Sequence, residues 1–233
     1  MDEREASPGK CLRSTRFIDS DHPSVTSFTE SVVAGASSER ERAVRLFYAV
    51  RDRIRYDPYV PDASPDRFKA STTLQIGATF CIPKAILLTA SARAAGIPAR
   101  LHFADVRNHL ATRRLLELLK SDVFVFHGYT ELWLDESWLK ATPTFNLSLC
   151  EKFGVRPLEF DGRSDAIFHA FDRSGKRHME YVRDRGVYTD LPFDAVLRAY
   201  RAAYPHLFDG RGYSVGVGTS NDDFEAEAAR ETD

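Results

Sequence analysis

The chain has 233 residues, a formal net charge of −2 and 43% hydrophobic residues. This length and composition predict one large domain, or a domain with an extension, that buries a sizeable core. The nearly neutral charge argues against a nucleic-acid surface, and no apolar run approaches the roughly 18 residues that span a bilayer.

The N-terminal sequence MDEREASPGK is charged and lacks the apolar core of a signal peptide. Three cysteines, Cys11, Cys81 and Cys150, are too few and too scattered for a disulfide framework. We therefore expect a cytoplasmic protein with free thiols, no membrane partner and no cofactor. The oligomeric state stays open.

The first elements are an arm and a helix. Residues 1–22 are polar and lack a clear periodicity, which predicts a flexible arm, although Phe17 and Ile18 could dock on the core. A helix is expected from about Ser38 to Arg55, because Ser38 followed by Glu41 matches a capping box.

The stretch from Gln75 to Arg100 predicts a central helix that begins near Cys81. Pro83 fixes the start, since proline is tolerated in a first turn but breaks a helix further along. Gly96 and Pro98 supply the stop. A thiol at a helix N-terminus can have a lowered pKa, which makes Cys81 a candidate nucleophile. The alternative is a small buried hydrophobic residue, as most lone cysteines are.

Strand signals follow the central helix. Residues 100–106 and 123–134 predict strands, with an amphipathic helix over 110–120 between them and a return strand from 138 to 141. In the longest strand, alternation places Phe124, Phe126, Leu132 and Leu134 on one face. This order of elements predicts an α+β fold, with the cysteine-bearing helix packed on an antiparallel sheet.

The rest of the chain gives weaker signals. Residues 168–172 and 178–182 predict a hairpin around 173–176, and 192–204 predict a helix. We expect four parts in the chain, which are a flexible arm (1–22), a catalytic core (23–150), an extension packed on the core (151–213) and an acidic disordered tail (214–233).

His127 is the distinctive histidine of the seven, because it lies mid-strand in an apolar stretch. It is either a core histidine bonded to a backbone carbonyl or the base that a cysteine nucleophile needs. Tyr129, Glu131 and Trp133 share its face of the strand. These three side chains line a cleft or pack under the C-terminal region.

Several segments together resemble the transglutaminase-like superfamily over roughly residues 40–150. They are LFYAVRDRIRYDPY from Leu46, Thr73-Leu74, Cys81, ARAAGIPAR from Ala92, HGYTELWL from His127 and WLKATPT from Trp138. The resemblance implies a papain-like Cys-His-Asp thiol enzyme in which Cys81 attacks an amide carbonyl and His127 carries the proton to the leaving amine. The acyl group then passes to water, giving hydrolysis or deamidation, or to an amine, giving cross-linking. The implied substrate is a peptide or protein amide, or a small amide.

The chain departs from the family pattern at two positions. Thr79-Phe80 precede the cysteine where the family commonly has an aspartate, and Thr142 occupies the position of the triad aspartate. A threonine hydroxyl can orient the imidazole but supplies no charge. Asn146 is a nearby neutral alternative as the orienting residue.

Gln75 lies six residues before Cys81, the spacing at which papain-like proteases have a glutamine that helps to bind the oxyanion; an ordinary loop glutamine is equally consistent. A metal site from Cys81, His127 and Cys150 is disfavoured, because the paired spacing of structural zinc ligands is absent. The second hypothesis is a catalytically inactive transglutaminase-like module that binds or scaffolds a partner.

Overall fold

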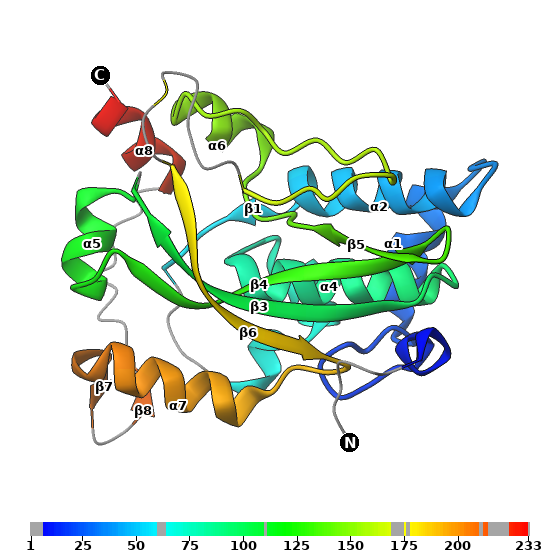
Figure 1. Cartoon of the computed structure of the whole chain (residues 1–233), viewed down its shortest axis with the longest axis horizontal. Helices are drawn as coiled ribbons and strands as arrows, with labels where there is room; N and C mark the ends of the chain where they lie inside the picture. Colours follow the sequence, from blue (N-terminus) through cyan, green and yellow to red (C-terminus); the bar gives the residue numbers. More distant parts are fainter. Residues whose placement is uncertain are drawn as a thin grey trace.

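A four-stranded antiparallel sheet forms the centre of the protein. The computed structural model describes residues 7–59, 64–109, 111–168, 175, 178–209, 212–213 and 224–232. The strands lie in the order β5-β4-β3-β6, formed by β3 (Ala99–Asn108), β4 (Val123–Leu134), β5 (Ser137–Ala141) and β6 (Met179–Tyr188). Helix α4 (Cys81–Ala94) packs against one face of this sheet (Figure 1). The predicted α+β fold is confirmed.

Helix α4 is enclosed on all sides. Helices α1 (Pro23–Val33), α2 (Glu39–Arg53) and α3 (Ala70–Ile76) contact it away from the sheet. All residues from Ile82 to Arg93 are therefore buried, not just one apolar face. Because two of these residues are cationic, the helix needs internal hydrogen-bond partners for them.

Lys84 and Arg93 find those partners in backbone carbonyl groups. The Lys84 ammonium donates to the carbonyl oxygens of Arg51, at 2.9 Å, and Ile54, and so caps the C-terminus of α2. Arg93 donates to the carbonyl oxygens of Ala99, Arg13 and Thr189. These bonds tie the two ends of α4 to distant parts of the chain.

The N-terminal segment lies against the core from Ser7 onward, where the sequence predicted a flexible arm. A short 3-10 helix, η2 (Pro8–Leu12), is followed by Phe17 and Ile18, which are 3% and 0% exposed. The carbonyl group of Phe17 accepts a hydrogen bond from the backbone N–H of Ala70 at 3.1 Å. Phe17 and Ile18 therefore both pack on the core, a possibility that the sequence had left open.

The later part of the chain contributes to the sheet as well as packing on it. Strand β6 pairs with β3, so the sheet extends beyond residue 150, where the predicted core ended. The predicted hairpin partner at 169–172 lies outside the described residues. The smaller elements are β1 (Arg55–Tyr56), β2 (Ala78–Thr79), η3 (Pro65–Phe68), α5 (Arg113–Leu119), α6 (Leu147–Lys152), α7 (Phe193–Ala203), η4 (Pro205–Leu207), β7 (Phe208–Asp209) and β8 (Gly212–Tyr213).

The chain ends in a packed helix, α8 (Phe224–Thr232), within the tail that was predicted to be disordered. Its Phe224 ring lies 5.6 Å from the ring of Tyr56, edge to face, and Ala228 is fully buried. The prediction for residues 224–232 is therefore wrong, while 214–223 lie outside the described residues. Across the described part of the chain, every helix is too short or too polar to cross a membrane.

Candidate active site

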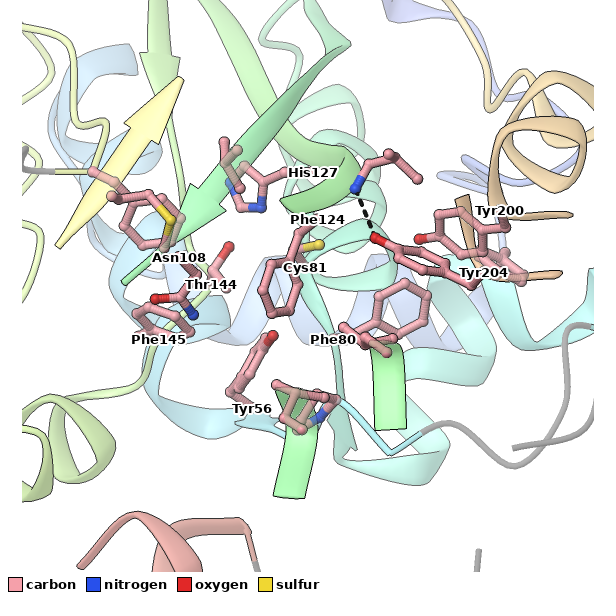
Figure 2. Close-up of a pocket in the computed structure, with 18 residues that line it drawn as sticks. Tyr56, Phe80, Cys81, Asn108, Phe124, His127, Thr144, Phe145, Tyr200 and Tyr204 are labelled. Carbon is pink, nitrogen blue, oxygen red and sulfur yellow. Dashed lines mark hydrogen bonds between the residues drawn. The ribbon is translucent and has the colours of Figure 1, made fainter. Parts of the chain in front are cut away.

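Cys81 and His127 line one cleft, at the point where α4 begins beside β4 (Figure 2). The cleft has a cavity volume of about 80 Å³. Cys81 is the first residue of α4, as predicted, and His127 lies within β4. Helix and strand thus bring the predicted nucleophile and the predicted base to the same cavity.

The edge of β4 is open where α4 meets it. Strand β5 pairs with β4 only from Thr130 to Leu134, so no described strand covers residues 123–129 on that side. The hydroxyl of Tyr204 partly replaces a strand, since it donates to Val123 O at 2.7 Å and accepts from Val125 N at 3.0 Å. The open edge leaves room for the thiol at the helix start.

Gly128 allows the helix to approach this edge closely. A Cβ atom at this position would lie 3.3 Å from Ile82 Cα and 3.1 Å from the Phe103 ring, which is tighter than ordinary van der Waals contact. The missing side chain brings the N–H of Gly128 beside the Cys81 sulfur. A glycine in a strand is typical where another backbone comes close.

A β-bulge just before His127 sets the direction of that side chain. Ala104 pairs with His127 and Val106 with Phe124, so β4 carries one extra residue between these pairs. Phe126 takes up the extra length with a left-handed backbone, φ 56°. Phe124 and His127 consequently share a face, and the predicted placement of Phe124 with Leu132 and Leu134 is wrong.

Asp105 holds this bulge. One carboxylate oxygen accepts the backbone N–H of Phe126 at 3.0 Å and Arg185 Nε at 2.8 Å, and the other accepts Arg185 Nη2 at 2.6 Å. Asp105 is 5% exposed, so the ion pair works in a largely dry environment. The pair stabilises a backbone conformation that a phenylalanine rarely adopts.

His127 is buried and uncharged. It is 4% exposed, its ring lies 5.0 Å from that of Phe168, and its Nε2 atom has no hydrogen-bond partner among the described residues. Burial lowers its pKa to about 3. The alternative reading of a histidine bonded to a carbonyl through this nitrogen is not supported.

Cys81 is half-buried, and burial of its thiol raises the pKa to about 11. The backbone N–H groups of Gly128, Ile82 and Cys81 itself favour the thiolate, but their effect is smaller than the cost of desolvation. The lowering of the Cys81 pKa that we expected from the helix N-terminus is therefore outweighed by burial. Because burial raises the pKa of Cys81 and lowers the pKa of His127, the resting pair is a neutral thiol and a neutral imidazole.

Two threonines occupy the region of the missing aspartate. Thr142 and Thr144 are each 1% exposed; the Thr142 hydroxyl lies beside the Tyr181 side chain, and the Thr144 Oγ1 atom has no hydrogen-bond partner among the described residues. Thr144 lines the cleft on the side of His127 (Figure 2), whereas Thr142 does not line it. The sequence reasoning missed Thr144, although it belongs to the same Thr-Pro-Thr segment. The orienting role of Thr142 stays a prediction.

Asn146 has a structural role instead of the orienting role considered for it. Its amide donates to Ser148 Oγ at 2.8 Å and Glu225 Oε1 at 2.7 Å, and its oxygen accepts from Tyr56 N at 2.9 Å. These bonds use the side chain to link α6, α8 and β1. The interpretation of Asn146 as a neutral triad member is wrong.

Gln75 is exposed on α3 and does not line the cleft. Helix α3 ends at Gly77, with φ 72°, and β2 then intervenes before Cys81. An exposed glutamine that does not line the cleft gives no support to the predicted oxyanion role.

Tyr129, Glu131 and Trp133 do not line the cleft either. Glu131 accepts from Arg100 Nε at 2.6 Å and lies 2.7 Å from His102 Nδ1, within a buried polar cluster on the sheet. Trp133 packs on Trp138 of β5, and Tyr129 packs on Tyr181 of β6, so packing against the later part of the chain holds for Tyr129 alone. Among the described residues, no group of three or more His, Cys, Asp or Glu side chains could hold a metal ion.

A family model of the transglutaminase-like superfamily matches residues 26–143. The chain belongs to the transglutaminase-like superfamily. The match stops before α6, β6, α7 and α8. No curated protein matches the chain in sequence.

Three solved structures are similar to the chain. A candidate cysteine protease from Cytophaga hutchinsonii is 14% identical, with a TM-score of 0.46 over 81% of this chain and 60% of that one. A candidate protease from Parabacteroides distasonis is 14% identical, with a TM-score of 0.39 over 60% of this chain and 26% of that one. The periplasmic domain of TgpA from Pseudomonas aeruginosa, bound to ethylmercury, is 16% identical, with a TM-score of 0.40 over 60% and 50%. The chain thus spans less than two thirds of each of these solved chains.

Proposed function

We propose that this protein is a thiol enzyme that acts on an amide or peptide bond through an acyl-enzyme on Cys81. The observation that carries the proposal is the placement of Cys81 and His127 in one cleft, and both residues lie within the segment 26–143 that matches the superfamily model. His127 also keeps a buried ring nitrogen without a partner, so it has the capacity to take a proton.

In the first step, Cys81 Sγ forms a bond to the substrate carbonyl carbon while its proton moves to His127. The carbon–nitrogen bond then breaks, and the imidazolium gives the proton to the leaving amine. Because the resting groups are neutral, proton transfer accompanies the attack instead of preceding it. Water, or an amine, then attacks the thioester and restores the thiol.

The negative charge on the carbonyl oxygen needs hydrogen-bond donors nearby. The backbone N–H groups of Gly128 and Cys81 already face the sulfur, so they are the groups best placed to serve. With Gln75 outside the cleft, we assign this role to backbone groups alone.

The test is a screen of glutamine-containing peptides and aryl amides, with and without an added amine, followed by measurement of ammonia or arylamine release. Cys81→Ala should abolish the release, while Cys11→Ala, which changes a buried thiol remote from the cleft, should keep it. Turnover that survives Cys81→Ala would contradict the proposal. A complete lack of turnover and of acyl-enzyme would favour a binding module.

A further inference from the structure

We propose that the acyl group of the substrate carries one apolar side chain, branched aliphatic or aromatic, which lies against a wall formed by Phe80, Tyr200 and Tyr204. This inference rests on the proposed function, because it assigns the acyl side of the same cleft. It goes further in naming which substrates the cleft selects.

The lining of the cleft is strongly apolar. Of its 18 lining residues, eight are Phe or Tyr, six are Pro, Val, Leu or Met, and four are Cys81, Asn108, His127 and Thr144. None of these described residues is Asp, Glu, Lys or Arg. A charged acyl group would lose its hydration without gaining an ionic partner, which disfavours its binding. The cleft therefore disfavours acidic and basic acyl groups.

The polar residues gather on one side of Cys81. In Figure 2, Asn108 and Thr144 lie on one side of the thiol, whereas Phe80, Tyr200 and Tyr204 lie on the other. The leaving amine must receive its proton from His127, which lies toward the polar side. The acyl group, on the opposite side of the scissile bond, then faces the aromatic wall.

The aromatic wall is held in place by the surrounding structure. Tyr204 is fixed by its two hydrogen bonds to β4, and its ring lies 5.9 Å from that of Tyr200. Phe80 packs edge to face on Phe68, at 5.8 Å, which in turn packs on Phe193 of α7. Tyr200 and Tyr204 lie outside the segment 26–143 that matches the superfamily, whereas Phe80 lies inside it, so the C-terminal part of this chain supplies two of the three wall residues.

The size of the cleft limits the acyl group to one side chain. Its volume of about 80 Å³ is smaller than the roughly 150 Å³ of an engineered cavity that binds benzene. Since the cleft is open on one side, a leucyl-sized or phenyl group can enter in part, but a larger fused ring system would protrude.

The inference can be tested with p-nitrophenyl esters that differ only in the acyl group. The set comprises 4-methylpentanoyl and 3-phenylpropanoyl esters, a glutaric monoester with a free carboxylate, and a 4-carbamoylbutanoyl ester. Cys81 Sγ bonds to the acyl carbon, the carbon–oxygen bond breaks, and p-nitrophenolate appears; water then releases the acid. We expect kcat/KM to be at least about tenfold higher for the two apolar esters.

Substitutions of Tyr200 test whether the aromatic wall causes the preference for apolar acyl groups. Tyr200→Arg should lower the ratio of kcat/KM for the 3-phenylpropanoyl ester over the glutaric ester by about tenfold or more, because it adds a cation to the wall. Arg198→Ala, at an exposed position of the same helix, should leave the ratio unchanged. Tyr200→Gln is the milder substitution, should the arginine prevent folding, and should lower the same ratio by a smaller factor.

The two proposals fail in different ways. Equal rates for all four esters, or an unchanged ratio in both Tyr200 variants, would overturn the apolar acyl assignment while acylation of Cys81 still supported the thiol enzyme. Failure of every ester to acylate Cys81 would instead overturn the proposed function.

Discussion

Burial keeps the side chains of the proposed nucleophile and base uncharged, with pKa values of about 11 for Cys81 and about 3 for His127. A stable thiolate–imidazolium ion pair would require the pKa of His127 to lie above the pKa of Cys81. At rest His127 is therefore poised as a general base, and proton transfer from Cys81 to His127 must follow substrate binding or a small motion of the site.

The first prediction concerns the reactivity of the three thiols toward iodoacetamide. Cys81 should react faster than Cys11 and Cys150, which are 0% and 2% exposed, but slowly at neutral pH. Its rate should rise as pH approaches about 11, because the thiolate is the nucleophile. Peptide mapping after timed alkylation gives the three rates. A rate for Cys81 that is already at its plateau at neutral pH would contradict the raised pKa.

The second prediction addresses the missing aspartate. Thr142→Asp should add a charge that raises the pKa of His127 by about 1 to 3 units from its value near 3. This makes proton transfer from Cys81 less unfavourable and should speed acylation of Cys81, measured as a pH profile. Thr142→Val keeps the shape and removes the hydroxyl, and Thr144→Val does the same at the cleft. If only Thr144→Val changes the pH profile, the orienting residue is Thr144; superimposable profiles for all variants would exclude both threonines.

At the level of elements, the bulge in β4 links a buried ion pair to the base. Asp105 and Arg185 hold the left-handed Phe126, which directly precedes His127. The Asp105 carboxylate, on β3, thus sets the direction of the His127 imidazole although Asp105 does not line the cleft.

The third prediction is that Asp105→Asn lowers kcat more than it raises KM, because the base is misplaced while the substrate wall is intact. The loss of charge opposite Arg185 should also reduce the free energy of unfolding by about 1–3 kcal/mol. Glu180→Gln, which weakens a more exposed ion pair on β6, is the matched control and should change neither. A stability loss with an unchanged kcat would show that Asp105 is structural only.

Strongly marked elements were predictable from the sequence, and the orientation of single side chains was not. Pro83, Gly96 and Pro98 fix the bounds of α4, and Ser38 caps α2 through a 3.1 Å bond to Glu41 N. The bulge at Phe126 carries no glycine to signal it, so the alternation of β4 was extended too far.

Residues that line the cleft from distant parts of the chain could not be predicted from the sequence either. Tyr200 and Tyr204 reach the cleft from more than 110 positions after Cys81, and no local pattern signals their approach. Asn146 was misassigned because its real partner, Glu225, belongs to a segment that looks disordered by composition. Local periodicity and motif order therefore predicted the two residues that meet in the cleft, and tertiary contacts decide what surrounds them.

For the whole molecule, the buried Lys84 connects stability to pH. Its pKa is lowered to about 7 by burial, from an ordinary 10.5, while its ammonium caps α2. Between these pH values the unfolded chain binds a proton that the folded chain binds only in part. Stability should therefore rise as pH increases from 7 toward 10.5.

The fourth prediction follows from this linkage. Between pH 7 and about 9.5, the wild-type protein should gain about 3 kcal/mol of unfolding free energy relative to Lys84→Met, which lacks the titrating group. Urea denaturation of both proteins at the two pH values gives the difference, and other titrating groups cancel in the comparison. Parallel pH dependences would mean that Lys84 keeps an ordinary pKa.

The proposed mechanism requires that Cys81 forms an acyl-enzyme with the help of His127. The most direct measurement is intact-protein mass spectrometry after rapid mixing with the 3-phenylpropanoyl p-nitrophenyl ester and acid quench, followed by peptide mapping. We expect a mass increase of one acyl group, located on Cys81, that forms much more slowly in His127→Ala and is absent in Cys81→Ala. An unmodified wild-type protein, or an acyl group on another residue, would contradict it.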